Sequence, residues 1–194
     1  MNLPITRERA WELILKYNKH EPDLIHYLES EAVMEGLAEY FGEDVKYWGM
    51  LGLLHDIDWG ITKNNIATHL TKVNEILKDF GFDDKFIETL VSHGYGFKEL
   101  PHLANKIRTE KVQYCLAAAE TVTGLIHAYA LMRGKKITGM DVNGLMKKFK
   151  DKTFAAKIDR NVIKEIEYTG LSLEKFFEIA IESIKKIKNK VGLD

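Results

Sequence analysis

The stretch GMLGLLHDID, residues 49–58, contributes most to the prediction of the fold, because an apolar run ends there on a histidine and two carboxylates. Apolar side chains lead into it at three- and four-residue spacing, at Val45, Trp48, Leu51 and Leu54. This spacing is typical of a helix. The sequence therefore predicts a helix that runs directly into His55 and Asp56.

The same periodicity extends over most of the 194 residues, which contain only three prolines. It predicts a helix over 24–41 that ends at Gly42 and another over 66–80 that ends at Gly81. A short helix should follow Asp83 or Asp84 and end near His93, and a long one should cover 110–132. Three more helices are expected after the caps Asp141, Asp159 and Ser172. No segment shows strand periodicity that a helix does not explain equally well. We therefore expect an all-α protein.

Composition excludes several classes of protein. Lys and Arg number 28 against 29 Asp and Glu, a net charge of −1, which argues against a non-specific nucleic-acid binder or an acidic disordered tail. The one cysteine, Cys115, cannot form an internal disulfide, and charges interrupt the region 1–16 where a signal peptide needs an apolar core. The apolar run 121–132 is too short to span a bilayer. We expect a cytoplasmic protein with no membrane partner.

Histidines and carboxylates form an ordered set along the predicted helices. Its members are His26, His55 with Asp56, His69, His93 and Glu120. Neutral imidazoles and ionised carboxylates are the usual ligands of divalent metals in enzymes. An unpaired imidazole within an apolar stripe would also be costly to desolvate. The pattern favours a metal site built from several helices.

This ordered set, with LLHDID at residues 53–58, resembles the HD-domain superfamily of metal-dependent phosphohydrolases, and in particular its small stand-alone bacterial members. The resemblance covers residues 23–132. It implies a helical core in which His26, His55, Asp56 and a fourth residue bind a metal. Glu120 occupies the fourth position, where the family has Asp. His69 and His93 match the second-metal ligands of the two-metal branch, in which Asp56 would bridge.

The resemblance also implies an organisation of the chain. We expect an HD-domain helical bundle core over 1–133 and a C-terminal helical extension over 134–194 packed on it as one unit. The last helix carries an apolar stripe at Phe176, Phe177 and Ile184 that can dock on the core or on a second subunit. A homo-oligomer is therefore compatible with the sequence.

Other residues have roles that the sequence leaves open. Asp58 can orient a ligand histidine, donate a proton, or cap the next helix. Residues 133–160 carry nine Lys and Arg against three Asp, and within them Lys152 is the residue we expect to contact phosphate. His127, two turns after Glu120, is expected to pack rather than bind metal. His20 and His102 are expected to face solvent.

These expectations lead to a metal-dependent hydrolase of phosphate esters, acting on a nucleotide or another small phosphorylated metabolite. Asp58 and Lys152 are the catalytic candidates, and the cofactor is one or two divalent ions of Zn, Mn, Fe, Co, Ni or Mg. Because Glu120 replaces the family's Asp, the alternative is a non-catalytic metal-binding module that acts as a sensor or interaction protein. Nucleic-acid binding through the basic segment and a di-iron oxygenase are weaker alternatives.

Overall fold

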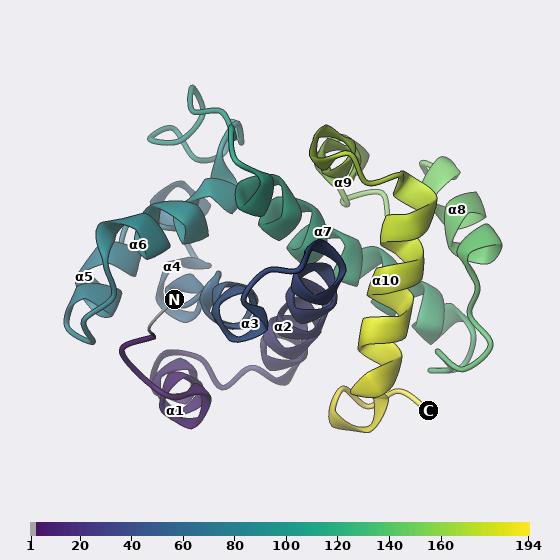
Figure 1. Cartoon of the computed structure of the whole chain (residues 1–194), viewed down its shortest axis with the longest axis horizontal. Helices are drawn as coiled ribbons and strands as arrows, with labels where there is room; N and C mark the ends of the chain where they lie inside the picture. The colour runs from purple at the N-terminus through teal and green to yellow at the C-terminus, as the bar shows by residue number, and fades with distance from the viewer. Residues whose placement is uncertain (1–2) are drawn as a thin grey trace.

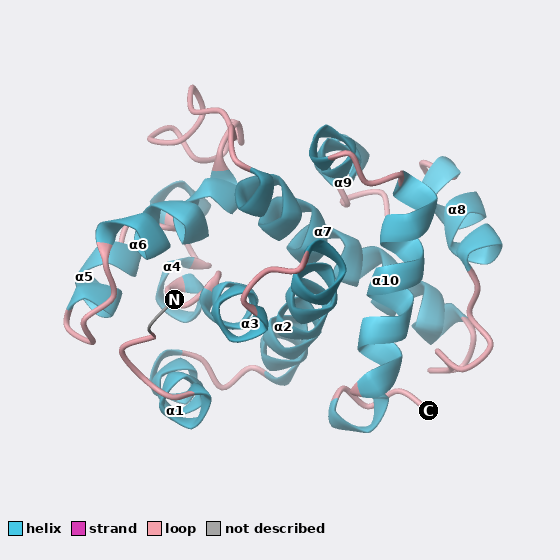
Figure 2. Ribbon diagram, in the orientation of Figure 1, coloured by secondary structure: helices cyan, strands magenta, loops and turns pink. Residues whose placement is uncertain are grey.

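The computed structural model describes residues 3–194, and within that range every regular element is a helix (Figure 2). The α-helices are α1 (Arg7–Tyr17), α2 (Glu21–Phe41), α3 (Val45–Leu54), α4 (Trp59–Thr62), α5 (Val73–Lys78), α6 (Asp84–Val91), α7 (Lys111–Met132), α8 (Val142–Lys150), α9 (Arg160–Lys164) and α10 (Leu173–Lys186). Short 3-10 helices cover Ile66–Thr68, Ser92–Gly94, Glu165–Thr169 and Lys188–Lys190. The prediction of an all-α fold is confirmed.

Helices α2, α3 and α7 form the centre of the molecule. Helix α7 runs diagonally through it, with α1 and α3–α6 on one side and α8–α10 on the other (Figure 1). Helix α2 packs against α3, α7 and α10, and α7 also contacts α8 and α9. Buried side chains of these helices join one continuous apolar core. The C-terminal helices thus pack on the same two helices that carry His26 and Glu120.

Several helix ends follow the expected signals. Gly42 ends α2 in the left-handed conformation, with a φ of 70°. Asp83 is the N-cap of α6, and its carboxylate accepts the N–H of Phe86. Helices α8, α9 and α10 begin after Asp141, Asp159 and Ser172, whose side chains each accept a backbone N–H of the first turn. These caps were predictable because they depend only on neighbouring residues.

The predicted helix over 66–80 is wrong. The chain forms a 3-10 helix at Ile66–Thr68, turns through Leu70 at a φ of 68°, and resumes as α5 at Val73. A left-handed leucine costs about 1–2 kcal/mol. Contacts with Asp58 offset this cost, because its carboxylate accepts both the His69 Nδ1–H, at 2.9 Å, and the Lys72 backbone N–H, at 3.1 Å. The break in the helix therefore follows from a distant carboxylate.

Among the described residues, α7 is long and apolar enough to cross a membrane by length and composition. Within its most apolar window, 61% of the residues are buried inside the protein. Its buried residues contact helices on both sides of the molecule (Figure 1). These contacts are typical of a core helix.

Gly52 provides a direct test of the packing between α2 and α3. A Cβ at this position would lie 2.5 Å from the Ser30 carbonyl oxygen, so the backbone of α2 or α3 would have to move. We expect Gly52→Ala to lower the free energy of unfolding by about 1–3 kcal/mol, as overpacking does. Chemical denaturation measures this loss.

Gly49, one turn earlier on the same helix, supplies the control. A Cβ there meets the Glu35 side chain, with the nearest atom at 2.9 Å, and that side chain can move aside. Gly49→Ala should cost much less than Gly52→Ala. Equal losses for the two variants would contradict the proposed close approach of the two backbones.

Candidate metal centre

The first group of ligands comes from the start of α2 and the end of α3. His26 lies on α2, and His55 is the C-cap of α3 with Asp56 directly after it. The Nε2 atoms of His26 and His55 lie 3.0 Å apart, and His55 Nε2 is 3.6 Å from Asp56 Oδ2. The three residues therefore form a group that could hold a metal ion.

A second group of histidines contacts the other oxygen of the Asp56 carboxylate, Oδ1. His69 Nε2 lies 3.1 Å from Asp56 Oδ1, and His93 Nε2 lies 3.2 Å from that oxygen. His69 follows the 3-10 helix Ile66–Thr68, whereas His93 is the middle residue of the 3-10 helix Ser92–Gly94. Asp56, His69 and His93 could hold a second ion, with the two oxygens of Asp56 facing the two groups.

All four imidazoles have an acceptor for their Nδ1–H. His55 donates to the Gly52 carbonyl at 2.8 Å, His93 to the Leu90 carbonyl at 2.7 Å, and His69 to Asp58 Oδ1 at 2.9 Å. His26 Nδ1 lies 2.9 Å from the Thr123 hydroxyl. Because that hydroxyl donates to the Glu120 carbonyl at 2.6 Å, it accepts from His26. We assign the tautomers from these partners, and they leave Nε2 as the ligand atom in each ring.

The donor set fits divalent cations. With the tautomers assigned above, the Nε2 atoms of His26 and His55 face each other with lone pairs at 3.0 Å, and a cation shared between them would remove their repulsion. The imidazole and carboxylate ligands suit Zn, Mn, Fe, Co or Ni. His26, His55, Asp56, His69 and His93 are therefore the residues that would hold the cofactor.

Burial and charge set the protonation of these groups. Burial lowers the pKa of His55 to about 3, so this ring is neutral at pH 7. Burial also opposes the charge on His69, but the carboxylates of Asp56 and Asp58 raise the pKa of His69 to about 10. For Asp56, burial favours the protonated form, yet the neighbouring rings of His55 and His69 hold its pKa well below the usual range.

Glu120 lies beside these groups without joining either of them. Its carboxylate accepts a hydrogen bond from the Thr121 hydroxyl. Burial raises the pKa of Glu120, and the neighbouring imidazoles of His93 and His26 oppose this rise. The residue is therefore electrostatically coupled to the cluster. Coordination by Glu120 stays a prediction.

The two predicted catalytic residues lie in very different places. Asp58 is fully buried behind His69, and its carboxylate makes no cap bond to α4, the helix it precedes. Its position matches the orienting role among the alternatives for this residue. Lys152 is exposed in the turn segment between α8 and α9 and belongs to neither metal group. Its predicted contact with phosphate stays a prediction.

The remaining histidines lie outside the two groups. His127 Nδ1 contacts Glu29 Oε1 at 2.7 Å and joins neither group. His20 and His102 are exposed, as expected.

Sequence reasoning missed several residues that support the cluster. The Tyr27 hydroxyl donates to the Asp56 carbonyl at 3.1 Å, and Trp59 packs edge-on against the His69 ring. Arg108 Nη1 donates to three carbonyls around the 3-10 helix of His93, those of Ser92, His93 and Tyr95. Tyr27 directly follows His26 in the chain, so its place in the sequence could have indicated that it lies near the metal ligands. Nothing in the sequence marks Arg108.

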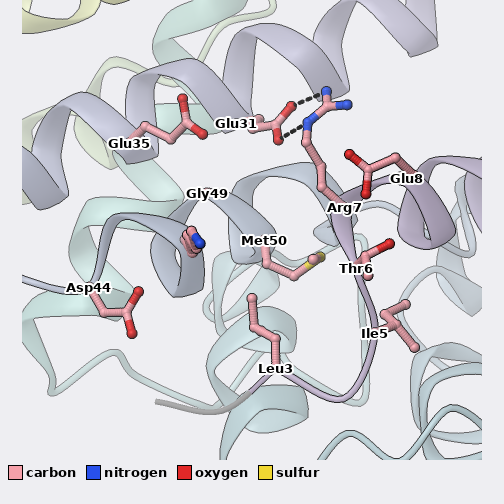
Figure 3. A pocket seen from close by; sticks show the side chains of 11 residues that line it. Leu3, Ile5, Thr6, Arg7, Glu8, Glu31, Glu35, Asp44, Gly49 and Met50 are labelled. Atoms are coloured by element: carbon pink, nitrogen blue, oxygen red, sulfur yellow. Dashed lines mark hydrogen bonds and ion pairs between the residues drawn. The ribbon is translucent and has the colours of Figure 1, made fainter.

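A cavity of about 680 Å³ lies elsewhere, between α1, α2 and α3. Figure 3 shows Arg7 reaching both carboxylate oxygens of Glu31, each at 2.6 Å, with Glu35 nearby. Burial raises the pKa of Glu35. The residues that line this cavity include none of the metal ligands. We therefore assign it no part in metal binding.

Comparison with known proteins gives one family. The family model of the HD domain matches residues 23–120, just over half of the chain, and this range contains all five residues of the two metal groups. No curated protein and no solved structure matches the chain at a significant level.

Asp58 allows a test of the support behind His69. Asp58→Asn keeps the size of the side chain but removes the carboxylate that orients the ring, so we expect metal affinity to fall by about 10- to 100-fold. Titration calorimetry with Mn²⁺ measures the change. Asp79→Asn, at an exposed carboxylate just after α5, is the control and should bind as the native protein does.

The raised pKa of His69 predicts proton release on metal binding. The free protein holds a proton on His69 near pH 7, because its pKa is about 10, and coordination requires the neutral ring. We expect about one proton released per ion bound beside His69, and apparent affinity that rises about tenfold per pH unit between pH 7 and 9. Calorimetry in buffers of different ionisation enthalpy counts the protons. A binding enthalpy that does not depend on the buffer would contradict this.

Proposed function

The chain belongs to the HD domain family, and from this membership and its metal site we propose that it hydrolyses phosphate esters of a nucleotide or another small phosphorylated metabolite. The superfamily consists of metal-dependent phosphohydrolase-type proteins. One observation carries the proposal: Nε2 of His55, His69 and His93 faces the two oxygens of Asp56, Nε2 of His26 faces His55, and each Nδ1–H is bonded elsewhere. Such an arrangement serves catalysis when it holds cations beside bound phosphate.

Divalent ions bound by these residues would lower the pKa of a bound water molecule and would place positive charge beside phosphoryl oxygens. The residues of the chain contribute orientation and protonation. Asp58 fixes the His69 ring and keeps Nδ1 protonated. Asp56 presents one oxygen to each ligand group and stays ionised. The buried, neutral His55 is ready to coordinate without losing a proton.

The small-molecule substrate is supported by charge and by the absence of a recognised nucleic-acid motif in the sequence. The net charge of −1 makes non-specific attachment to nucleic acid unfavourable. The segment 133–160, with a net charge of +6, provides cations that favour anionic ligands. We place the protein in the cytoplasm, where phosphorylated metabolites are abundant, and include no membrane partner in the proposal.

The proposal is tested with protein reconstituted with Mn²⁺, Zn²⁺, Co²⁺ or Fe²⁺ and a panel of phosphomonoesters, phosphodiesters and nucleoside triphosphates. We expect turnover of at least one class, and a loss of about 100-fold or more in kcat for His55→Asn, since a ligand is removed. Asp79→Asn is the matched control. If no substrate class is hydrolysed under any metal, the proposal is wrong.

The second candidate function is a metal-binding module without turnover. The position of Glu120 favours it, because the carboxylate engages Thr121 and lies outside both metal groups. Glu120→Asp distinguishes the two functions. Strong phosphatase activity that appears only in this variant would support the non-catalytic module, whereas full activity of the native chain would exclude it.

A further inference from the structure

A groove of about 530 Å³ lies between α2 and α7, next to the metal site but on the other edge of the His26 ring. His26 and Thr123 form part of its wall, on the Nδ1 side of the ring, whereas Nε2 of His26 faces His55. Apolar side chains line much of the remainder, among them Ile25 and Leu131. The groove is therefore separate from the two groups of metal ligands, although it shares one residue with them.

An ion pair in this groove has no role in metal binding. Glu29 is 2% exposed, and its Oε1 lies 2.7 Å from His127 Nδ1. The hydrogen bond to Glu29 raises the pKa of His127, which favours the imidazolium form. With Nδ1–H donated to the buried carboxylate, the second N–H of the ring, at Nε2, remains to serve a ligand. The His127 side chain is 24% exposed, so a small molecule can reach it.

Lys135 also lines this groove and adds a second cationic side chain, on a backbone in an unusual conformation. It follows Gly134 at a φ of 76°, and its own φ is 66°, in the left-handed region that a lysine rarely adopts. The C-terminal residue holds this turn: the Asp194 N–H donates to the Lys135 carbonyl at 3.0 Å, and Asp194 Oδ1 accepts from the Ile137 N–H at 2.9 Å. Strained backbone of this kind is often found at ligand sites.

The two cations face one space. Lys135 is near enough for its charge to lower the pKa of His127, against the effect of Glu29. Glu29 is already paired with His127, and Glu21, also among the lining residues, is exposed. An anion placed between the Lys135 ammonium and the His127 ring would favour the protonated ring and accept hydrogen bonds from both groups. The apolar walls would at the same time cover an organic group.

We propose that the groove between α2 and α7 binds a small organic oxyanion, a phosphate or phosphonate with an apolar body, through His127 Nε2 and Lys135 Nζ. The apolar body lies against Ile25 and Leu131. This site is distinct from the metal centre and does not depend on the proposed hydrolysis. Because Thr123 bonds both His26 and the Glu120 carbonyl, an occupant of the groove would touch residues that orient a metal ligand.

The test uses the full chain, as purified with its metal, and phenylphosphonate as the probe. Nuclear magnetic resonance follows the backbone amides of Gly134 and Lys135 and the ring of His127, which report on the groove. We expect saturable shifts at these three positions. The shifts should persist after chelation of metal. An absence of shifts, or their loss on chelation, would overturn the proposal.

Variants at Lys135 and Lys136 distinguish a specific contact of the Lys135 ammonium from a general effect of positive charge. Lys135→Gln should lower the affinity for phenylphosphonate by at least about tenfold, since a charge-assisted hydrogen bond is lost. The control variant Lys136→Gln, at the exposed neighbouring lysine, should keep the affinity within about twofold of native. Lys135→Gly removes the ammonium while relieving the left-handed strain, so its weaker binding cannot be ascribed to misfolding. Native affinity in both Lys135 variants would overturn the proposal. Methylphosphonate, which lacks the ring, should bind more weakly than phenylphosphonate, and equal affinity would contradict the apolar contact.

Discussion

Four imidazoles each donate their Nδ1–H to an acceptor outside the cluster, which leaves their four Nε2 atoms gathered around the carboxylate of Asp56. Buried lone pairs in contact repel one another unless a proton or a cation lies between them. The packing of α2 and α3 imposes this contact on His26 and His55. The surrounding helices therefore hold a polar arrangement that a metal ion would complete, and the stability of the core makes this possible.

Several local features of the backbone orient these imidazole rings. Gly52 allows the backbones of α2 and α3 to approach, and its carbonyl accepts the proton of His55. The left-handed Leu70 breaks a helix so that His69 can reach both Asp56 and Asp58. Arg108 joins the carbonyls around His93 to Glu165, a residue beyond the family match. The segment after residue 120 thus contributes directly to the position of a ligand.

The His26 ring separates two regions of different chemistry. On its Nε2 side lie imidazoles and a carboxylate suited to cations, and on its Nδ1 side lies a groove lined by His127 and Lys135. Thr123 links the two sides, because its hydroxyl joins His26 to the backbone of Glu120.

Periodicity and caps determined the all-α class and most helix ends, because those signals come from residues within one turn of each other. The order of histidines and carboxylates likewise indicated the family and five residues that meet in space. Only the tertiary structure decided that the helix over 66–80 breaks, that Glu120 lies outside both groups, and that Lys135 lines a groove beside His26. Each of these features depends on contacts between residues that are distant in the chain. The energies of such contacts cannot be read from the local pattern of the sequence.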